Sequence, residues 1–323
     1  MPDCPSIPDI AHSLATARRV ILLCHLRPDG DAYGSSLGLA HLLQQQGVET
    51  LVYNEDGLVP MYAFLPGSEQ IQRTPKEASP ADLIVSLDTS TQERLGPTFN
   101  SWGRQVDFNL DHHVSNTSYA RHNLIRPDLP ATAALVQELA AVAGWPLSTQ
   151  AASCLFVGLS TDTGSFRYRG TTAQTFHQAA ALLEAGADSA ELSRLCYQSM
   201  SRERFALLRL AYASLVTECN DSLAYYTLTP EMFEQSSAKP EDTEGIVESS
   251  LLVDSIQLGA LFEHKRDGSL KVSLRSKGRI NVSQIASSFG GGGHPGAAGI
   301  NFPSQSQINQ EKVLQELRRA LNS

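Results

Sequence analysis

The sequence predicts an α/β protein: a parallel-sheet domain with helices on both faces, followed by a smaller α/β domain, with a cleft between the two. Its 323 residues are too many for one ordinary core. Strand and helix patterns alternate in the first half, which is typical of a parallel sheet. Near residues 220–221 the character changes to strands in antiparallel style, which indicates a second domain.

The first domain is expected to cover residues 1–200. It opens with a short, β-branched and leucine-rich run, which is typical of a buried strand, and continues with a helix that ends at Gly47. A strand, a helix and a second strand in this order form a parallel unit. The predicted elements are a strand at 19–25, a helix at 33–46, strands at 49–54, 82–87 and 105–110, and helices within 131–198.

An amphipathic helix that begins at the capping residue Ser201 is expected to link the domains over residues 201–221. The second domain then covers residues 222–323. Its last two predicted strands enclose the turn Arg266-Asp267-Gly268, which is a good hairpin signal. The predicted strands are 223–229, 256–264 and 269–275.

Composition limits the class of protein. With 41% hydrophobic residues the chain can bury real cores, and its net charge of −9 argues against a protein that coats long nucleic acid. A small anionic substrate stays open, since a bound metal supplies its own positive field. Residues 1–17 lack a signal-peptide pattern, and no apolar run approaches the roughly 20 residues that span a bilayer. We expect a cytoplasmic protein without a membrane partner.

Acidic and imidazole side chains follow three of the predicted strands. They are His25, Asp29 and Asp31 after the first strand, Asp88 after the strand at 82–87, and Asp111, His112 and His113 after the strand at 105–110. The carboxyl ends of parallel strands share one sheet edge, where ligands gather. The alternatives are a solvated acidic turn around Asp29 and a helix cap at Asp88. The matched placement after three strands favours one shared site.

Asp162 is expected to join this site. It follows an apolar helix, and a carboxylate near a helix C-terminus is unfavourable unless a cation compensates. Carboxylates and imidazoles without a thiolate suit Mn²⁺ or Mg²⁺, and the imidazoles favour Mn²⁺. Seven or eight ligands are too many for one ion, so two divalent metal ions are predicted, bridged by one carboxylate.

These motifs resemble those of the DHH phosphoesterase family. HLRPDGD at 25–31, Asp88, DHH at 111–113 and Asp162 are similar to its four metal motifs, and the run from Arg275 to Gly299 is similar to the substrate-binding motif of its DHH-associated C-terminal domain. Together the matches span residues 25–299. The compact layout resembles the nano-RNase group, also described as oligoribonuclease and 3′-phosphoadenosine 5′-phosphate phosphatase.

The resemblance implies a role for each motif residue. One metal would be held by His25, Asp29 and Asp88, and the other by Asp31, Asp88, His112 and Asp162, with Asp88 as the bridge. The catalytic residues would be His113, facing the scissile phosphate, Asp111, orienting its neighbours, and Asp88. In the C-terminal motif, Arg275 and His294 are expected to bind a substrate phosphate, together with the backbone of Gly291, Gly292 and Gly293.

The implied function is hydrolysis of short oligoribonucleotides, linear dinucleotides such as pApA, and 3′-phosphoadenosine 5′-phosphate. The implied partner is a short RNA or small nucleotide, and a homodimer is a family-based expectation. Two alternatives stay open: a manganese-dependent inorganic pyrophosphatase or polyphosphatase, and an inactive nucleotide- or RNA-binding module. The glycine-rich motif counts against the first, and the intact ligand motifs count against the second.

Overall fold

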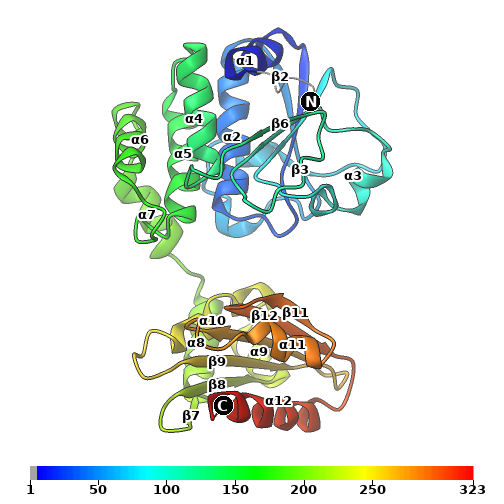
Figure 1. The fold of residues 1–323 in the computed structure, drawn as a ribbon, viewed down its shortest axis with the longest axis vertical. Coiled ribbons are helices and arrows are strands. Elements are labelled where there is room, and N and C mark those ends of the chain that lie inside the picture. The colour runs from blue at the N-terminus through cyan, green and yellow to red at the C-terminus, as the bar shows by residue number, and fades with distance from the viewer. Residues whose placement is uncertain (1–5, 323) are drawn as a thin grey trace. The chain divides into compact units, whose positions relative to one another are not determined.

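A computed structural model describes residues 6–322 and divides the chain into two compact units, Met1–Ser199 and Met200–Ser323 (Figure 1). Each unit has a six-stranded sheet and buried apolar clusters of its own. The helix predicted as a linker is α8 (Arg202–Ala213), and it belongs to the second unit. Within the described residues, none of the helices combines the length and the apolar character that crossing a bilayer requires.

The first unit is built on a sheet in which every strand pair is parallel, as predicted. The strand order is β3-β2-β1-β4-β5-β6, so the chain leaves β1 in one direction for β2 and later returns to its other side with β4. The carboxyl ends at such a switch point form a natural ligand site. The strands are β1 (Arg19–Leu23), β2 (Glu49–Asn54), β3 (Ile71–Arg73), β4 (Leu83–Leu87), β5 (Phe108–Asp111) and β6 (His122–Ile125).

Helices cover both faces of this sheet, which confirms the predicted fold class. Alternate strand residues such as Val20 and Leu22 face the larger apolar core, and Ile21 and Leu23 face a smaller one that includes Phe99. The larger core lies under α1 (Ile7–Thr16), α2 (Gly30–Gln45), α4 (Thr132–Ala143) and α5 (Thr149–Asp162), with α6 (Ala173–Glu184) and α7 (Ser189–Tyr197) against α5. The short α3 (Pro97–Ser101) lies on the smaller core.

The second unit contains a mixed sheet of order β11-β12-β10-β9-β8-β7. The expectation of antiparallel strands is wrong for β8 and β9, which pair in parallel. Their connection is long enough for helices α9 (Pro230–Ser236) and α10 (Ile246–Ser250), and such a crossover permits parallel pairing. The strands are β7 (Val216–Glu218), β8 (Leu223–Leu228), β9 (Leu258–His264), β10 (Leu270–Ser276), β11 (Gly292–His294) and β12 (Ala297–Phe302).

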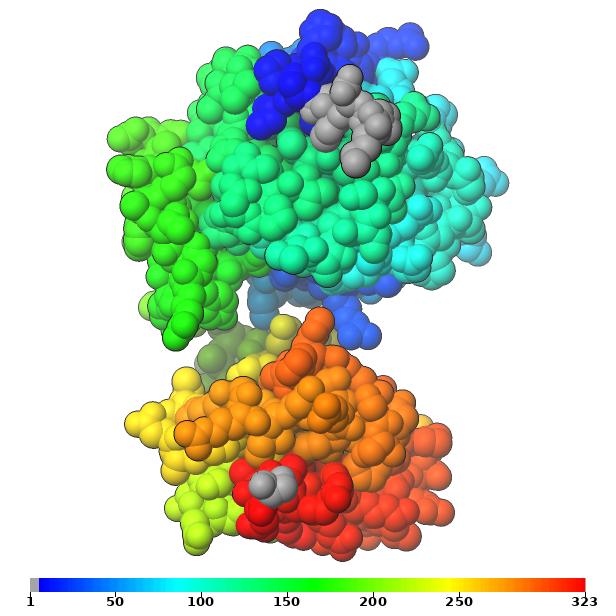
Figure 2. Space-filling view, in the orientation of Figure 1, coloured from blue at the N-terminus to red at the C-terminus, as the bar shows by residue number. Residues whose placement is uncertain are grey.

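Helices cover the two faces of the second sheet unequally. On one face α11 (Val282–Ser288) and α12 (Ser306–Leu321) pack over a continuous core, and α12 lies at the surface of this unit (Figure 2). On the other face, α8 and α10 pack on residues of β8 and β9 such as Tyr226 and Leu261. The rest of that face is at least partly exposed in β10, β11 and β12. Its part near β11, here called the open sheet face, consists of Ser273, Arg275, Gly292, His294, Ala297 and Gly299.

Candidate metal centre and substrate-binding residues

The carboxyl ends of β1, β4 and β5 bring the predicted metal ligands of the first unit together. These strands are neighbours in the sheet, so the residues that follow them meet at one edge. Asp29 and Asp31 reach the same place from the start of α2, and Asp162 reaches it from the last turn of α5. Three groups of side chains lie close enough to hold a cation: His25, Asp29 and Asp88; Asp31, His112 and Asp162; and Asp88, His112 and His113.

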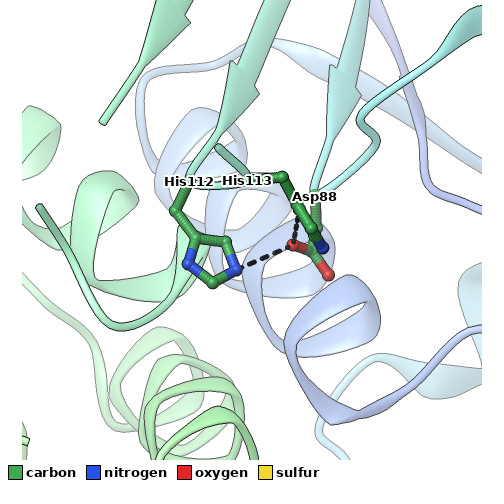
Figure 3. A group of neighbouring side chains, drawn as sticks. All are labelled: Asp88, His112 and His113. Atoms are coloured by element: carbon green, nitrogen blue, oxygen red, sulfur yellow. Dashed lines mark ion pairs between the residues drawn. The ribbon is translucent and has the colours of Figure 1, made fainter. Parts of the chain in front are cut away.

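Asp88 lies between the two halves of this centre. One carboxylate oxygen, Oδ2, is 3.4 Å from Nε2 of His25, and the other, Oδ1, is 3.5 Å from Nε2 of His112 (Figure 3). The residue is buried and has a left-handed backbone with φ of 54°. It does not cap a helix, since the next helical turn begins at Gln92 after Thr91. A carboxylate that offers one oxygen to each side has the arrangement of a bridging ligand.

Asp29 has two functions at the start of α2. Its Oδ1 accepts hydrogen bonds from the backbone N–H groups of Asp31 and Ala32 at 3.1 and 3.0 Å, which makes it the N-cap. The helix therefore begins at Gly30 and not at Tyr33, where the sequence pattern had placed it. The second oxygen, Oδ2, lies 3.8 Å from Nε2 of His25. Capping thus fixes the direction in which this carboxylate faces the centre.

Asp31 also has a structural function besides its place in the centre. Its two oxygens accept hydrogen bonds from the backbone N–H groups of Thr132 and Ala133, at 2.6 and 2.9 Å, at the start of α4. Oδ2 of Asp31 is 4.0 Å from Nε2 of His112, and Oδ2 of Asp162 is 2.9 Å from the same atom. The second half of the centre is therefore held by the ends of three helices.

The histidines of the centre lie in the field of its carboxylates. Burial lowers the pKa of His25, but Asp29 and Asp88 outweigh burial and raise this pKa to about 10. His112 follows the same pattern: burial lowers its pKa, while Asp162 and the neighbouring acids raise it to about 10. Both imidazoles are surrounded by negative charge.

Burial and the close approach of several acids raise the pKa values of Asp31 and Asp88. Burial, and then the charge of Asp88, raises the pKa of Asp31 well above its usual value. Burial also raises the pKa of Asp88, to which Asp29 and Asp162 contribute further. Buried acids this close together are unfavourable as anions unless a cation neutralises them. The electrostatics of the centre therefore favour bound positive charge.

The donor set fits divalent metal ions. Nε2 of His112 is buried and makes no hydrogen bond of good geometry, although carboxylate oxygens of Asp31, Asp88 and Asp162 lie within 4.0 Å of it, an arrangement that suits a metal ligand. The surrounding donors are carboxylate oxygens and imidazole nitrogens, and none of the three groups in the described chain contains a thiolate. Hard cations such as Mn²⁺ and Mg²⁺ prefer this donor set. The sharing of Asp88 and His112 between groups suits a pair of ions.

His113 and Asp111 form a pair at the side of the centre. Nδ1 of His113 lies 2.7 Å from Oδ1 of the buried Asp111, and this contact raises the pKa of His113. Asn116 donates to the second oxygen of Asp111 at 2.5 Å and to Oδ1 of Asn109 at 2.7 Å. The sequence interpretation missed Asn116. Its position five residues after Asp111 and three residues after His113 was the available signal.

The predicted substrate-binding residues lie together in the second unit. Arg275 and His294 both pair in register with Ala297, on β10 and β11 either side of β12, so the three side chains share the open sheet face. Within the glycine run, Gly293 has φ of +147°, and a Cβ there would meet the carbonyl oxygen of Ala297 at 2.4 Å. Gly292 has ordinary backbone angles and no atom within 4 Å of a Cβ. Packing therefore explains Gly293 but not Gly292.

The segment 264–279 is rich in lysine and arginine, but several of these side chains pair with acids. Lys265 and Lys271 both pair with the buried Glu263, at 3.0 and 2.7 Å. Nε of Arg275 donates to Oε1 of Glu248 on α10 at 2.7 Å. Glu263, directly before the segment, and Glu248 on α10 thus neutralise part of its charge. The Arg275 side chain remains partly exposed on the open sheet face.

Comparisons with known proteins agree with these motifs. Residues 19–159 match the family described as DHH family, N-terminal domain, and residues 220–323 match the DHHA1 domain. The chain is 30% identical over 312 residues to the bifunctional oligoribonuclease and PAP phosphatase NrnA of Thermus thermophilus, covering 94% of this chain and 90% of that protein. It is 29% identical over 306 residues to the probable bifunctional oligoribonuclease and PAP phosphatase NrnA of Streptococcus mutans, covering 94% of each.

The fold has a close counterpart among solved structures. An exopolyphosphatase-related protein from Bacteroides fragilis superposes with a TM-score of 0.85 at 25% identity, over 98% of this chain and 97% of that one. The family matches fall on both units, and the relatives align over almost their whole length. The chain therefore belongs to the DHH family of phosphoesterases, which are hydrolytic enzymes.

Proposed function

We propose that this chain hydrolyses short oligoribonucleotides and 3′-phosphoadenosine 5′-phosphate at a centre of two divalent ions. The bridging position of Asp88 is the observation that carries the proposal, because each of its oxygens faces a different imidazole. The names of the full-length relatives supply the substrate class. His25, Asp29 and Asp88 would hold one ion, and Asp31, Asp88, His112 and Asp162 would hold the other.

The bound ions would supply a hydroxide nucleophile near neutral pH and positive charge for the phosphoryl oxygens. The protein's own residues do the rest. Asp88 and the helix-capping Asp29 and Asp31 fix the spacing of the centre. Oδ1 of Asp111 accepts a hydrogen bond from Nδ1–H of His113 and raises the pKa of this histidine, so that Nε2 also carries a proton, which it can donate to a phosphoryl oxygen. No covalent nucleophile is needed.

The open sheet face of the second unit supports recognition of a phosphate group. Arg275 offers a guanidinium that can contact phosphate with two N–H groups, His294 offers an imidazole, and Gly292 leaves its backbone accessible. An oligoribonucleotide and 3′-phosphoadenosine 5′-phosphate both carry a phosphate besides the one that is cleaved. A site of this kind would distinguish them from a simple phosphomonoester.

Mn²⁺ is the ion we propose for the centre, with Mg²⁺ as the alternative. Two of the six ligands are imidazoles, His25 and His112, whose nitrogen donors suit Mn²⁺ better than Mg²⁺. Activity of the metal-stripped protein reloaded with either ion would decide between them.

A substrate panel tests the proposed function. Purified protein loaded with Mn²⁺ is given pApA, a short RNA, 3′-phosphoadenosine 5′-phosphate, pyrophosphate and tripolyphosphate, and product release is measured. The three nucleotides should be cleaved and the inorganic substrates should not. Asp88→Asn should abolish turnover of every substrate, because it removes the shared anionic ligand. Exclusive turnover of pyrophosphate or tripolyphosphate would overturn the nucleotide assignment and favour the polyphosphatase alternative.

Arg275→Ala tests the open sheet face in the same assay. It should raise KM for the nucleotides by roughly tenfold to a hundredfold with little change in kcat, because a contact remote from the reacting bond supplies binding. Arg319→Ala is the matched control, since Arg319 pairs with Glu316 on its own helix and is largely exposed. Equal KM values for Arg275→Ala and the wild-type protein would exclude Arg275 from substrate binding.

A further inference from the structure

Nδ1 of His25 has two close neighbours, and one ring nitrogen cannot form a hydrogen bond with both at the same time. The carbonyl oxygen of Leu26 lies 2.8 Å from it, and Nη2 of Arg94 lies 3.0 Å from it. A carbonyl oxygen only accepts a hydrogen bond, and a guanidinium only donates one. Nδ1 can therefore donate to Leu26 when it carries a proton, or accept from Arg94 when it does not.

Metal binding would decide between these two neighbours. Nε2 of His25 is the nitrogen that faces Asp29 and Asp88 in the centre. When Nε2 binds a metal, the ring proton must lie on Nδ1, where it donates to the carbonyl oxygen of Leu26. The guanidinium of Arg94 then faces an N–H group and needs another acceptor.

The backbone of Arg94 is held beside His25 of the centre. The N–H group of Leu26 donates to the carbonyl oxygen of Arg94 at 2.7 Å, which ties this backbone to the loop that carries His25. Arg94 is half-buried in the turn Gln92–Leu95, and among residues 6–322 it forms no ion pair. A half-buried guanidinium beside a histidine of the centre that forms no ion pair within the described residues is available for an anionic ligand.

We propose that Arg94 is a phosphate-binding residue of the metal-loaded centre. In the metal-loaded centre, where Nδ1 of His25 carries a proton and cannot accept a hydrogen bond, the guanidinium donates to a phosphoryl oxygen of the substrate. The proposal deepens the proposed function, since it rests on a phosphate ester that binds at this centre.

The test separates metal binding from phosphate binding. Arg94→Met keeps the length of the side chain and removes its charge, and Arg94→Gln is a second neutral variant should the first fail to fold. Mn²⁺ affinity is measured by titration calorimetry, and inorganic phosphate is then titrated into the Mn²⁺-loaded protein. Both variants should retain Mn²⁺ affinity or gain it, while the dissociation constant for phosphate rises roughly tenfold to a hundredfold. Arg121→Met is the control, because Arg121 is exposed and pairs with Asp107.

Each other outcome has a distinct meaning. Unchanged phosphate affinity in Arg94→Met or Arg94→Gln would overturn the proposal. Weakened Mn²⁺ affinity with normal phosphate affinity of the loaded protein would also overturn it, because Arg94 would then only support the ring of His25. Failure of the wild-type protein to bind Mn²⁺ would instead count against the metal centre and the proposed function as a whole.

Discussion

Asn116 fixes the carboxylate on which the orientation of His113 depends. It donates to Oδ2 of Asp111, while Oδ1 of the same carboxylate accepts from Nδ1 of His113. Its own Oδ1 accepts from the backbone N–H of Ser118 at 2.7 Å, so both ends of the amide are used. Asn116 therefore acts on the reacting groups through Asp111, as a positioning residue.

We expect Asn116→Ala to lower kcat by about tenfold to a hundredfold while KM and Mn²⁺ affinity stay close to the wild-type values. Loss of a group that orients a neighbouring site residue typically has an effect of this size. Steady-state kinetics on pApA together with a Mn²⁺ titration would measure it. Asn100→Ala, at an exposed position in α3, serves as the control. A large change in KM or in Mn²⁺ affinity would mean that Asn116 supports the centre generally and does not act through His113.

Strand β11 contains two glycines of different kinds: packing requires Gly293 but does not require Gly292. Gly293→Ala should lower the thermal stability of the second unit, because its φ of +147° and its contact with the backbone of Ala297 leave no room for a Cβ. Strain of this kind costs about 1–3 kcal/mol. Gly292→Ala should leave stability unchanged and raise KM for the nucleotide substrates. Thermal unfolding and kinetics on the two variants measure both effects. Normal KM in Gly292→Ala would show that no ligand approaches this backbone.

The elements around the centre could be predicted where local pattern and tertiary structure agree. The apolar runs that became β1, β2 and β4 are bounded by polar residues and lie close to their predicted limits. The sequence pattern gave the wrong secondary structure where contacts with residues distant in sequence determine it. The helix expected over residues 201–221 ends at Ala213, because Val216–Glu218 pairs with β8 as a strand. The short β6, with its polar start at His122, is a strand because β5 lies beside it.

The site residues were predictable because their chemistry is unusual at strand ends, but their second contacts were not. Nothing local to Asp31 indicates that its carboxylate caps α4, a helix that begins 101 residues later. The pairing of Arg275 with Glu248 likewise joins β10 to α10 across 27 residues. Arg94 reaches His25 across 69 residues. Such contacts depend on the order of strands in the sheet, which spacing along the chain does not give.

At the scale of the whole molecule, metal binding concerns one of two units that have separate cores. The predicted ligands all lie in the first unit. The apolar clusters of the second unit contain no residue of the first unit. Mn²⁺ should therefore stabilise the first unit and leave the second unchanged. Binding at about 100 times the dissociation constant contributes about 2.7 kcal/mol. For a unit of this size that free energy corresponds to a rise in Tm of roughly 5–10 °C.

Asp88→Asn should be at least as stable as the wild-type protein without metal and less stable than it with Mn²⁺. In metal-free protein the buried Asp88 is an unfavourable anion among Asp29 and Asp162, so the neutral amide should raise Tm or leave it unchanged. With Mn²⁺ the wild-type protein should be the more stable, because the variant has lost the ligand that both ions share. Calorimetry in EDTA and in Mn²⁺ measures both states, with the exposed Asp128→Asn as control. Equal destabilisation of Asp88→Asn in both conditions would mean that this carboxylate supports the fold and not a pair of cations.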